Sequence, residues 1–398
     1  MSDTQAIKDK LDIVDFISEY LQLKPAGVNH KGLCPFHHEK TPSFMVSRER
    51  QSWHCFGCSK GGDIFTFVQD IEGMEFVEAL RLLAERADVP LTFKESNIAE
   101  GNQRTRIKDI NVAAARFFHN FLLQMPPAKI AREYLKQRGL SEQTIIDWQI
   151  GYIPEQWDLL TQYLLKKGFG IDDLVAAGLS IQKQGTQRFY DRFRGRIMFP
   201  IWDVHGNVVG FTGRVLVETE HSGGKYVNTP QTAVYDKSRV VFGLNKAKQE
   251  IKAKDMIVMV EGQMDVIACH QAGMKNVIAT SGTALTEEQI KILQRYSSNL
   301  AIAFDADSAG IAASKRGIDL ALIGGMNIKV VQIPEGKGKD ADECLKKNPE
   351  VWFLAVKSAK DVMVWYLERA FAGRDVSQPK IKQAIANEIL SEIGRIPY

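Results

Sequence analysis

Two pairs of candidate metal ligands lie within the stretch CPFHHEKTPSFMVSRERQSWHCFGC, residues 34–58. Cys34 and His37 form the first pair, Cys55 and Cys58 form the second, and each pair encloses two residues. This spacing lets one tight turn present two ligands to a single ion, and thiolate sulfur with imidazole nitrogen suits tetrahedral Zn²⁺. Four protein ligands leave no open position for water. We therefore predict one structural zinc ion.

His38 and His54 compete with His37 for the fourth place. The two-residue spacing favours His37, because His38 needs a different turn and His54 adjoins Cys55. Between the pairs, apolar and polar residues alternate on both sides of the polar turn 48–50. This alternation predicts a hairpin that folds the second pair back onto the first.

Small zinc ribbons often bind nucleic acid or protein, and this one carries side chains that suit phosphate contacts and base stacking. These side chains are Arg48, Arg50, Trp53, Phe56 and Lys60. The alternative is that the aromatic residues cover the small core of the ribbon, and we weigh it at least equally for Phe44 and Phe56.

The composition indicates a soluble protein with reduced cysteines. At ~150 residues per domain, 398 residues predict two or three domains. The N-terminus lacks the apolar core of a signal peptide, and no apolar run approaches the ~20 residues that span a bilayer. Five cysteines argue against a disulfide framework, and ordinary thiols are expected at Cys269 and Cys344. We predict a cytosolic protein.

The net charge of +3 is small, but one strip of the chain is basic. Residues 183–196 hold a single acid, Asp191, against five basic side chains: Lys183, Arg188, Arg192, Arg194 and Arg196. Such a run is typical of a solvated surface, and it also fits a local site for a polyanion.

Apolar spacing predicts the helices of the first part of the chain. Residues 4–22 are expected to form one amphipathic helix, with an apolar face made of Ile7, Leu11, Val14, Ile17 and Leu21. After a glycine turn at 61–62, helical spacing continues with a break at Gly73 and a stop at Pro90. The polar stretch 94–109 is expected to be a linker.

The remaining pattern predicts a multidomain protein of α+β and α/β class. Within 195–216, a His-Gly-Asn turn at 205–207 predicts a hairpin in a mixed α+β subdomain. From residue 255, the runs DMIVMV, KNVIAT, LAIAFD and NIKVVQIP alternate with helical stretches. This alternation predicts a parallel sheet covered on both faces, followed by C-terminal helices.

Acidic residues follow three of these strand-like runs. They are Glu261 with Asp265, Asp305 with Asp307, and Asp340 with Asp342. Because ligands gather at the carboxyl ends of parallel strands, the three groups are expected at one edge. Crowded carboxylates need a cation, and oxygen ligands select Mg²⁺ or Mn²⁺, two of which commonly serve phosphoryl transfer. The alternative is that each acid only caps a helix or solvates a loop. For any one motif this alternative is favoured, and for three motifs with the same topology the metal site is favoured.

These motifs resemble those of one known family. CPFHHEKTPSF…WHCFGC resembles the zinc-binding domain of bacterial DnaG-type DNA primases. VEGQMDV, FDADSAG and KDADE are similar to the metal-binding motifs of the Toprim fold, which primases share with topoisomerases and some nucleases. YLKQRGLSEQTI…GYIP, RFRGRIMFPIWD…GNVVGFTGRVL, KYVNTPQT and YDKSRVVFGL resemble the primase polymerase core, so the resemblance covers nearly the whole chain.

The resemblance implies synthesis of RNA primers from ribonucleoside triphosphates on single-stranded DNA at the replication fork of the bacterial cytosol. It implies that Glu261, Asp305 and Asp307 are catalytic, that Asp305, Asp307 and Asp340 hold Mg²⁺ or Mn²⁺ beside Glu261, and that Asp342 and Asp265 support them. It also implies contacts with template or triphosphate from Arg138, Arg194, Arg196, Arg214, Lys225, Asn228 and Lys237. Arg194 and Arg196 could instead be ion-pair partners of nearby acids.

The resemblance also implies a division of the chain. The expected parts are a zinc-ribbon DNA-binding domain (1–95), a linker (96–108), the N-terminal part of the RNA polymerase core (109–253), the Toprim metal-binding subdomain (254–343) and C-terminal helices (344–398). Family members usually carry a further helical domain that docks on the replicative helicase, and this sequence ends before it. Ala306 and Ala341 stand where many members have Gly and Pro, small changes that should keep activity. The alternatives are a non-catalytic single-strand-binding adaptor and another Toprim enzyme.

Overall fold

The computed structural model describes residues 3–37, 39–72, 76–90, 95–218, 223–280, 285–303 and 317–394. The chain divides into two compact units, Met1–Thr105 with Gln294–Tyr296, and Arg106–Leu293 with Ser297–Tyr398. The boundary at Thr105 lies within the predicted linker 96–108. That stretch is helical, however, because helix α5 extends over Glu95–Gln124. Each unit is described separately below.

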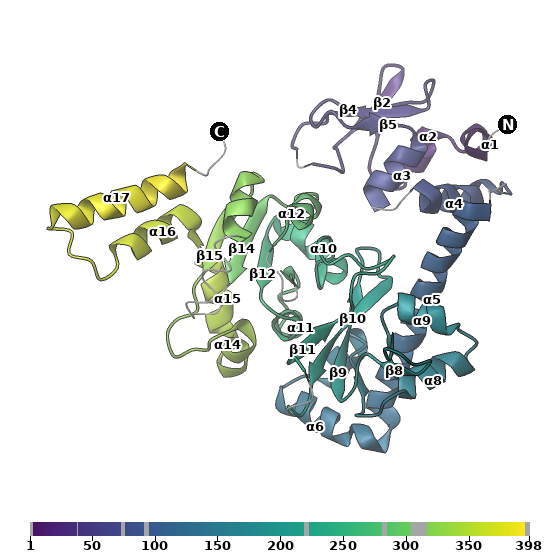
Figure 1. Ribbon diagram of the computed structural model, residues 1–398. Coiled ribbons are helices and arrows are strands. Elements are labelled where there is room, and N and C mark those ends of the chain that lie inside the picture. The colour runs from purple at the N-terminus through teal and green to yellow at the C-terminus, as the bar shows by residue number, and fades with distance from the viewer. Residues whose placement is uncertain are drawn as a thin grey trace. The chain divides into compact units, whose positions relative to one another are not determined.

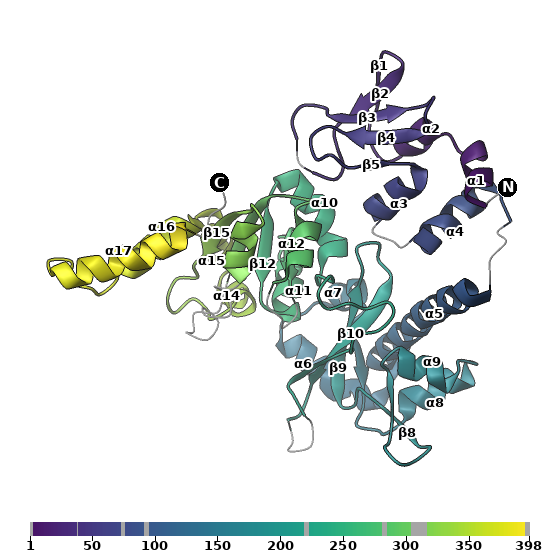
Figure 2. The same cartoon turned by 45° about the horizontal axis from the view of Figure 1, so that its top comes forward.

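The first unit is built on a five-stranded antiparallel sheet whose strands pair in chain order (Figures 1 and 2). The strands are β1 (Lys24–Ala26), β2 (Asn29–Gly32), β3 (Phe44–Ser47), β4 (Ser52–Cys55) and β5 (Gly61–Gly62). Helices α3 (Ile64–Glu72) and α4 (Phe76–Ala87) follow. The predicted hairpin between the ligand pairs is confirmed as β3–β4, whereas the expected glycine turn at 61–62 is a strand.

The predicted helix over 4–22 is two helices, α1 (Asp3–Lys10) and α2 (Ile13–Ser18). Asp12 interrupts it, because its carboxylate accepts hydrogen bonds from the backbone N–H groups of Val14 and Asp15 at 2.9 and 3.1 Å. Aspartate is a favoured N-cap residue, so this side chain starts a new helix. Periodicity located the buried face correctly at Ile7 and Ile17, which are both fully buried.

Aromatic rings form the core of the first unit. Phe44 stacks on Trp53 with ring centroids 5.1 Å apart, and Phe67 of α3 meets both rings edge-on. The Trp53 indole N–H donates to the carbonyl of Asp63 at 3.0 Å, which satisfies its one polar group inside the core. This core supports β3 and β4, the hairpin between the two ligand turns.

The second unit begins with a helical layer and an antiparallel sheet. The helices are α5, the 3₁₀ turn η1 (Pro126–Ala128), α6 (Lys129–Gln137), α7 (Glu142–Asp147), α8 (Leu159–Lys166) and α9 (Ile171–Ala176). The sheet has the order β11-β10-β9-β6, with bounds Tyr226–Asn228, Val208–Val215, Arg196–Trp202 and Gly151–Ile153. A separate hairpin pairs β7 (Ser180–Gln182) with β8 (Phe189–Asp191). The hairpin predicted at 205–207 is confirmed as β9–β10.

The predicted parallel sheet is also confirmed. Its order is β13-β12-β14-β15-β16, with bounds Val277–Ala279, Ile257–Val260, Asn299–Ala303, Asn327–Val331 and Lys360–Asp361. The first four strands are parallel and β16 is antiparallel to β15. The associated helices are α10 (Leu244–Lys254), α11 (Gln263–Gln271), α12 (Glu287–Leu293), α14 (Ala341–Lys347) and α15 (Pro349–Lys357).

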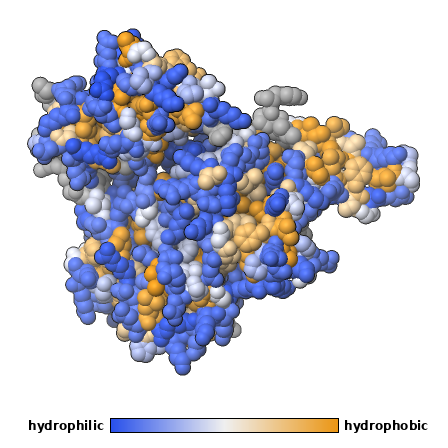
Figure 3. Space-filling model, turned by 180° about the vertical axis from the view of Figure 1, so that it is seen from behind, coloured by the Kyte–Doolittle hydropathy of each residue, from blue (hydrophilic) through white to orange (hydrophobic). Residues whose placement is uncertain are grey.

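Helices α16 (Val362–Phe371) and α17 (Pro379–Ile393) end the chain as an adjacent pair that keeps apolar side chains at the surface (Figures 1 and 3). Exposed examples are Val364, Leu367, Phe371, Leu390 and Ile393. In α17 the buried hydrophobic side chain is Ile385. Among the described residues, no helix has the length and apolar character needed to cross a membrane.

His270 of α11 makes the second unit sensitive to acid. Its Nε2 donates to the carbonyl of Val277 at 2.9 Å, and its ring packs edge-on against Trp148. Burial, reinforced by the charges of Lys246 and Lys275, lowers the pKa of His270 from 6.5 to about 4. Below pH 6.5 the unfolded chain takes up this proton while the folded chain does not, so stability falls as the pH drops toward 4.

We expect this residue to cost the wild type up to about 3 kcal/mol of unfolding free energy by pH 4. His270→Gln keeps a side-chain N–H donor but cannot titrate, so it should lose less stability over that range. Urea unfolding of both proteins at about pH 7 and about pH 4.5 measures the difference. An equal loss in both proteins would contradict the prediction.

Candidate metal centres and nucleic-acid interface

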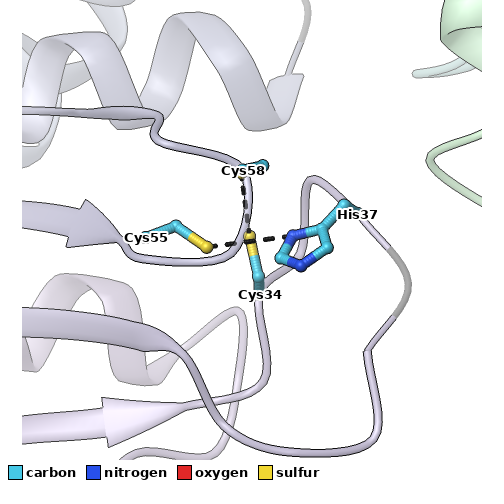
Figure 4. Close-up of side chains that lie close together, drawn as sticks. All are labelled: Cys34, His37, Cys55 and Cys58. Carbon is cyan, nitrogen blue, oxygen red and sulfur yellow. Dashed lines mark hydrogen bonds between the residues drawn. The ribbon is translucent and has the colours of Figure 1, made fainter.

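The two predicted ligand pairs meet in the first unit. Ligand atoms of Cys34, His37, Cys55 and Cys58 all lie within 4.8 Å of one another (Figure 4). The two sulfurs of Cys34 and Cys58 are 3.9 Å apart, and the Cys55 sulfur lies 3.8 Å from Nδ1 of His37. Two sulfurs bound at about 2.3 Å to a tetrahedral zinc would be roughly 3.8 Å apart. The donor set and its spacing therefore fit one zinc ion.

Each ligand pair sits on a turn that donates a backbone N–H to its first cysteine. The N–H of Phe36 points to the Cys34 sulfur and that of Gly57 to the Cys55 sulfur, both at 3.4 Å. A Cβ at Gly57 would lie 2.6 Å from Nε2 of His37, so glycine allows the imidazole to approach this turn. His54 is exposed on the face of β4 opposite Cys55, and His38 lies outside the described residues.

Glu39 supports the ligands through contacts with His37 and with the backbone of Cys34. The sequence analysis did not identify this residue. Its carboxylate lies 3.2 Å from Nε2 of His37 and accepts the backbone N–H of Cys34 at 2.7 Å. It also accepts the backbone N–H of Ser43 at 3.0 Å and the Ser43 hydroxyl. Burial opposes ionisation, but these hydrogen bonds and His37 hold the pKa of Glu39 below its usual value. The carboxylate thus leaves Nδ1 of His37 to face the ion.

Glu39→Gln should weaken zinc binding by about 10- to 100-fold, because a carboxylate behind a ligating histidine raises its basicity and fixes its orientation. Competition with a chromogenic chelator measures the affinity. Glu49→Gln, in the exposed hairpin turn of the same ribbon, is the matched control. Equal affinities of the two variants would show that Glu39 does not support the site.

Burial also raises the pKa of the Cys34 and Cys58 thiols. A buried thiolate is costly without a cation to neutralise it, so Cys34 and Cys58 need the ion in order to deprotonate. Burial also opposes ionisation at Cys55, but hydrogen bonds from Ser43 and from backbone N–H groups outweigh it and lower the pKa of its thiol. The requirement at Cys34 and Cys58 suits a structural zinc, whose binding free energy contributes to folding.

In the second unit, two acidic motifs meet where α11 and α14 begin. Glu261 follows β12 directly and precedes α11, and its side chain is exposed. Asp265, in the first turn of α11, accepts the backbone N–H of Gly262 at 3.2 Å and that of Asp342 at 3.1 Å. One buried carboxylate therefore ties the first turns of both helices together and brings the two motifs to the same edge.

Asp340 and Asp342 are used differently at this edge. The Asp340 carboxylate caps α14 by accepting the Glu343 N–H at 2.7 Å. Asp342 is almost fully buried and pairs with Arg138 and with Lys346, the latter at 2.7 Å. Burial opposes the charge on Arg138, but Asp342 outweighs this effect and raises the pKa of the guanidinium. The charge on Arg138 is therefore retained inside the fold.

Asp305 and Asp307 lie outside the described residues, so the structure gives no geometry for them. Among the described residues, one group of His, Cys, Asp or Glu side chains has its ligand atoms close enough together to hold a metal ion. That group is the zinc site of the first unit. Because β14 is parallel to β12, its carboxyl end points to the same edge as Glu261. Carboxylates at this edge suit a hard divalent cation.

Basic and polar side chains line the antiparallel sheet of the same unit. The guanidinium of Arg214 lies 4.6 Å from the ring centre of Tyr134, and Arg138 donates to the Tyr134 hydroxyl at 3.1 Å. Lys225 and Lys237 are exposed. Asn228 is held by a relay in which Gln263 donates to the hydroxyl of Thr212 at 3.1 Å and Thr212 donates to the amide oxygen of Asn228 at 2.7 Å.

Two side chains that were predicted to contact nucleic acid are buried. Trp53 is only 2% exposed and belongs to the ribbon core, so it offers no stacking face. Arg196 is 4% exposed and donates to the carbonyls of Gly213 and Gly224 at 3.2 and 3.0 Å. It anchors the connection between β10 and β11.

The remaining predicted contacts of the ribbon are at its surface. Arg50 is exposed, Arg48 pairs with Asp12 and Asp15, and Lys60 pairs with Asp70 at 3.0 Å. Exposed ion pairs are worth little, so Arg48 and Lys60 can exchange these partners for phosphate groups at small cost.

Comparisons with known proteins match three consecutive parts of the chain. Residues 1–99 match the family model of the CHC2 zinc finger, residues 117–248 that of the DNA primase catalytic core, N-terminal domain, and residues 258–345 a Toprim-like model. Fold and site thus define a zinc-finger protein with a Toprim-like metal-binding domain.

A DNA primase of Clostridium acetobutylicum is 41% identical over 370 residues, which cover 92% of this chain and 60% of that protein. The crystal structure of the zinc-binding and RNA polymerase domains of the Aquifex aeolicus primase is 30% identical, covers 100% of this chain and 98% of that chain, and has a TM-score of 0.62. A DnaG primase catalytic domain bound to single-stranded DNA is 31% identical over 75% of this chain and 95% of that chain, with a TM-score of 0.64.

The chain belongs to the DnaG-type primase family, and both the zinc ribbon and the Toprim fold predicted from its sequence are confirmed. It spans 60–65% of the length of the first three curated relatives.

Proposed function

We propose that the chain synthesises short RNA primers from ribonucleoside triphosphates on single-stranded DNA. The observation that carries this proposal is the joining of the Glu261 and Asp340–Asp342 motifs through Asp265 at one edge of a parallel sheet. The same unit carries the basic residues Arg138 and Arg214, which suit a polyanionic template and a triphosphate. Family membership supports the same activity.

In the proposed site, Glu261, Asp305 and Asp307 are catalytic, and Asp340 completes the oxygen ligands. Two Mg²⁺ or Mn²⁺ ions would supply activation of the attacking hydroxyl and stabilisation of the leaving pyrophosphate. Asp265 acts as a positioning residue for both helix starts. Asp342 holds Arg138 near the acidic edge.

The proposed substrate contacts follow from charge, with Lys225 and Lys237 exposed and Arg194 and Arg214 half-buried. Arg194, Arg214, Lys225 and Lys237 would neutralise phosphate groups of the triphosphate or the template, and the relay through Thr212 would orient the amide of Asn228. The zinc ribbon would hold template through Arg48, Arg50 and Lys60. We further propose a cytosolic location and a replicative helicase as partner of the whole protein.

A primer-synthesis assay tests the proposal with wild type, Asp305→Ala and Asp307→Ala on mixed-sequence single-stranded DNA with labelled ribonucleotides and Mg²⁺ or Mn²⁺. Template-dependent short RNA that disappears in both variants is expected. Single-strand binding without any product would favour a binding adaptor. Nicking or relaxation of supercoiled DNA would favour another Toprim activity.

A further inference from the structure

Trp157 is an exposed indole on a rigid support. It lies just before α8, and its side chain is 69% exposed, although burial of this large apolar ring would be favourable. The other five tryptophans of the chain, Trp53, Trp148, Trp202, Trp352 and Trp365, are all at most 8% exposed. A single exposed tryptophan held in one orientation is a candidate for ligand contact.

The support is Arg194, which lies against the indole. The guanidinium carbon of Arg194 is 4.6 Å from the ring centre of Trp157 and 5.4 Å from that of Tyr190. Tyr190 itself meets Trp157 edge-on at 6.0 Å. Arg194 covers one face of the indole and holds the ring in place. Because 69% of the side chain is exposed, the other face is open to solvent.

The segment that carries these rings is fixed by hydrogen bonds. The backbone N–H of Asp191 donates to the carbonyl of Trp157 at 2.6 Å, and the Asp191 carbonyl accepts from Arg194 at 2.6 Å. The fully buried Asp191 carboxylate accepts the N–H groups of Leu160 and Thr161 at 2.7 and 2.9 Å. Little conformational entropy would therefore be lost when a ligand stacks on the indole.

Charge around the platform selects the ligand. Lys183 and Arg188 are exposed on the β7–β8 hairpin, and they add to the positive charge of Arg194. The acids beside the platform are Glu155, 3.6 Å from Arg194, and the exposed Asp158 next to Trp157, so the basic side chains are in excess. Aromatic faces beside mobile cations suit a single strand, in which each base has an open π-face next to a phosphate. A duplex hides those faces within its own stack.

We propose that Trp157, supported by Arg194, stacks a base of single-stranded template DNA. The inference rests on the proposed primase function, which requires such a template. It adds a stacking contact to the basic residues considered above. The basic strip 183–196 would then form one side of the surface that binds the strand.

The test uses the fluorescence of Trp157, because acrylamide quenches exposed indoles much more than buried ones. Mixed-sequence single-stranded DNA should protect wild type from quenching, whereas Trp157→Phe should lose this response. Neither the corresponding duplex nor inorganic polyphosphate should protect, since they offer charge without open bases. Equal protection by polyphosphate would overturn the proposal in favour of a site for charge alone.

Direct binding supplies the second readout. Trp157→Ala should bind the single strand roughly 5- to 150-fold more weakly, the range for loss of one stacked base, and Trp157→Phe should recover most of the affinity. Leu354→Ala, which truncates a side chain that is 62% exposed on α15, is the matched control and should bind like wild type. Circular dichroism confirms that each variant is folded.

The outcomes separate this inference from the proposed function. If wild type makes primers but Trp157→Ala binds the single strand as tightly as wild type, the stacking site is refuted and the function stands. If single-stranded DNA protects Trp157 but wild type makes no template-dependent RNA, the stacking site stands and the primase function is refuted.

Discussion

Glu261→Gln is expected to lower primer synthesis about a thousandfold, because losing this carboxylate removes roughly 4 kcal/mol of transition-state stabilisation at the metal edge. Glu261 follows β12 and is exposed at the carboxyl end of the strand, where the parallel sheet directs its acidic residues. The substitution keeps the size of the side chain and removes its charge. The rate of labelled RNA formation at saturating Mg²⁺ is the measurement.

The matched control is Glu250→Gln on α10, where the carboxylate pairs with Lys254 on the helix surface at 2.9 Å. This variant should synthesise primers at the wild-type rate. Calorimetric titration with Mn²⁺ separates metal binding from chemistry, and Glu261→Gln should bind the ion more weakly. Synthesis by Glu261→Gln within threefold of the control would remove Glu261 from the proposed catalytic set.

Removal of zinc should unfold the ribbon and leave the second unit folded. Zinc-finger peptides gain about 10–16 kcal/mol from zinc at pH 7, which is as large as the whole stability of an ordinary domain, about 5–15 kcal/mol. The first ligand turn lies between β2 and β3, and the second joins β4 to β5, so loss of the ion should release both turns of the sheet at once. Limited proteolysis after chelation should therefore cut within residues 1–105 and spare the second unit.

Cys55→Ser is the corresponding variant and should hold less than one zinc per chain. Cys269→Ala is the matched control, because Cys269 is buried in α11 of the second unit and outside the ligand cluster. It should keep one zinc per chain and an intact ribbon. A full complement of zinc in Cys55→Ser would mean that another residue supplies the fourth ligand.

Some errors of the sequence analysis were avoidable. Side chains two apart on a strand share a face, so a Cys55 that turns inward to the metal places Trp53 inward as well. The alternation SWHC is buried at Trp53 and Cys55 and exposed at His54, as this rule requires. Asp12 is a favoured N-cap residue and so indicated the start of a second helix. The apolar spacing that continues through residues 4–22 led us to expect a single helix instead. Local rules of this kind act over a few residues and are contained in the sequence.

Other features depend on segments that are distant along the chain. Asp342 pairs with Arg138 across 204 positions, and Trp157 meets Arg194 only because β8 returns to the start of α8. No spacing rule predicts such pairs, since their distances depend on how helices and sheets pack. Glu39 is intermediate, because its position near His37 was visible but its hydrogen bonds to Cys34 and Ser43 were not.

The sequence by itself determined the zinc ligands, the parallel strands and the acids that follow them, because two-residue turns and strand ends are local geometries. Only the tertiary structure decided which charged and aromatic side chains remain available to a ligand. It buried Trp53 and Arg196, paired Asp342, and left Trp157 exposed on Arg194. The physical reason is that burial is a property of the packed surface, to which residues from every part of a unit contribute.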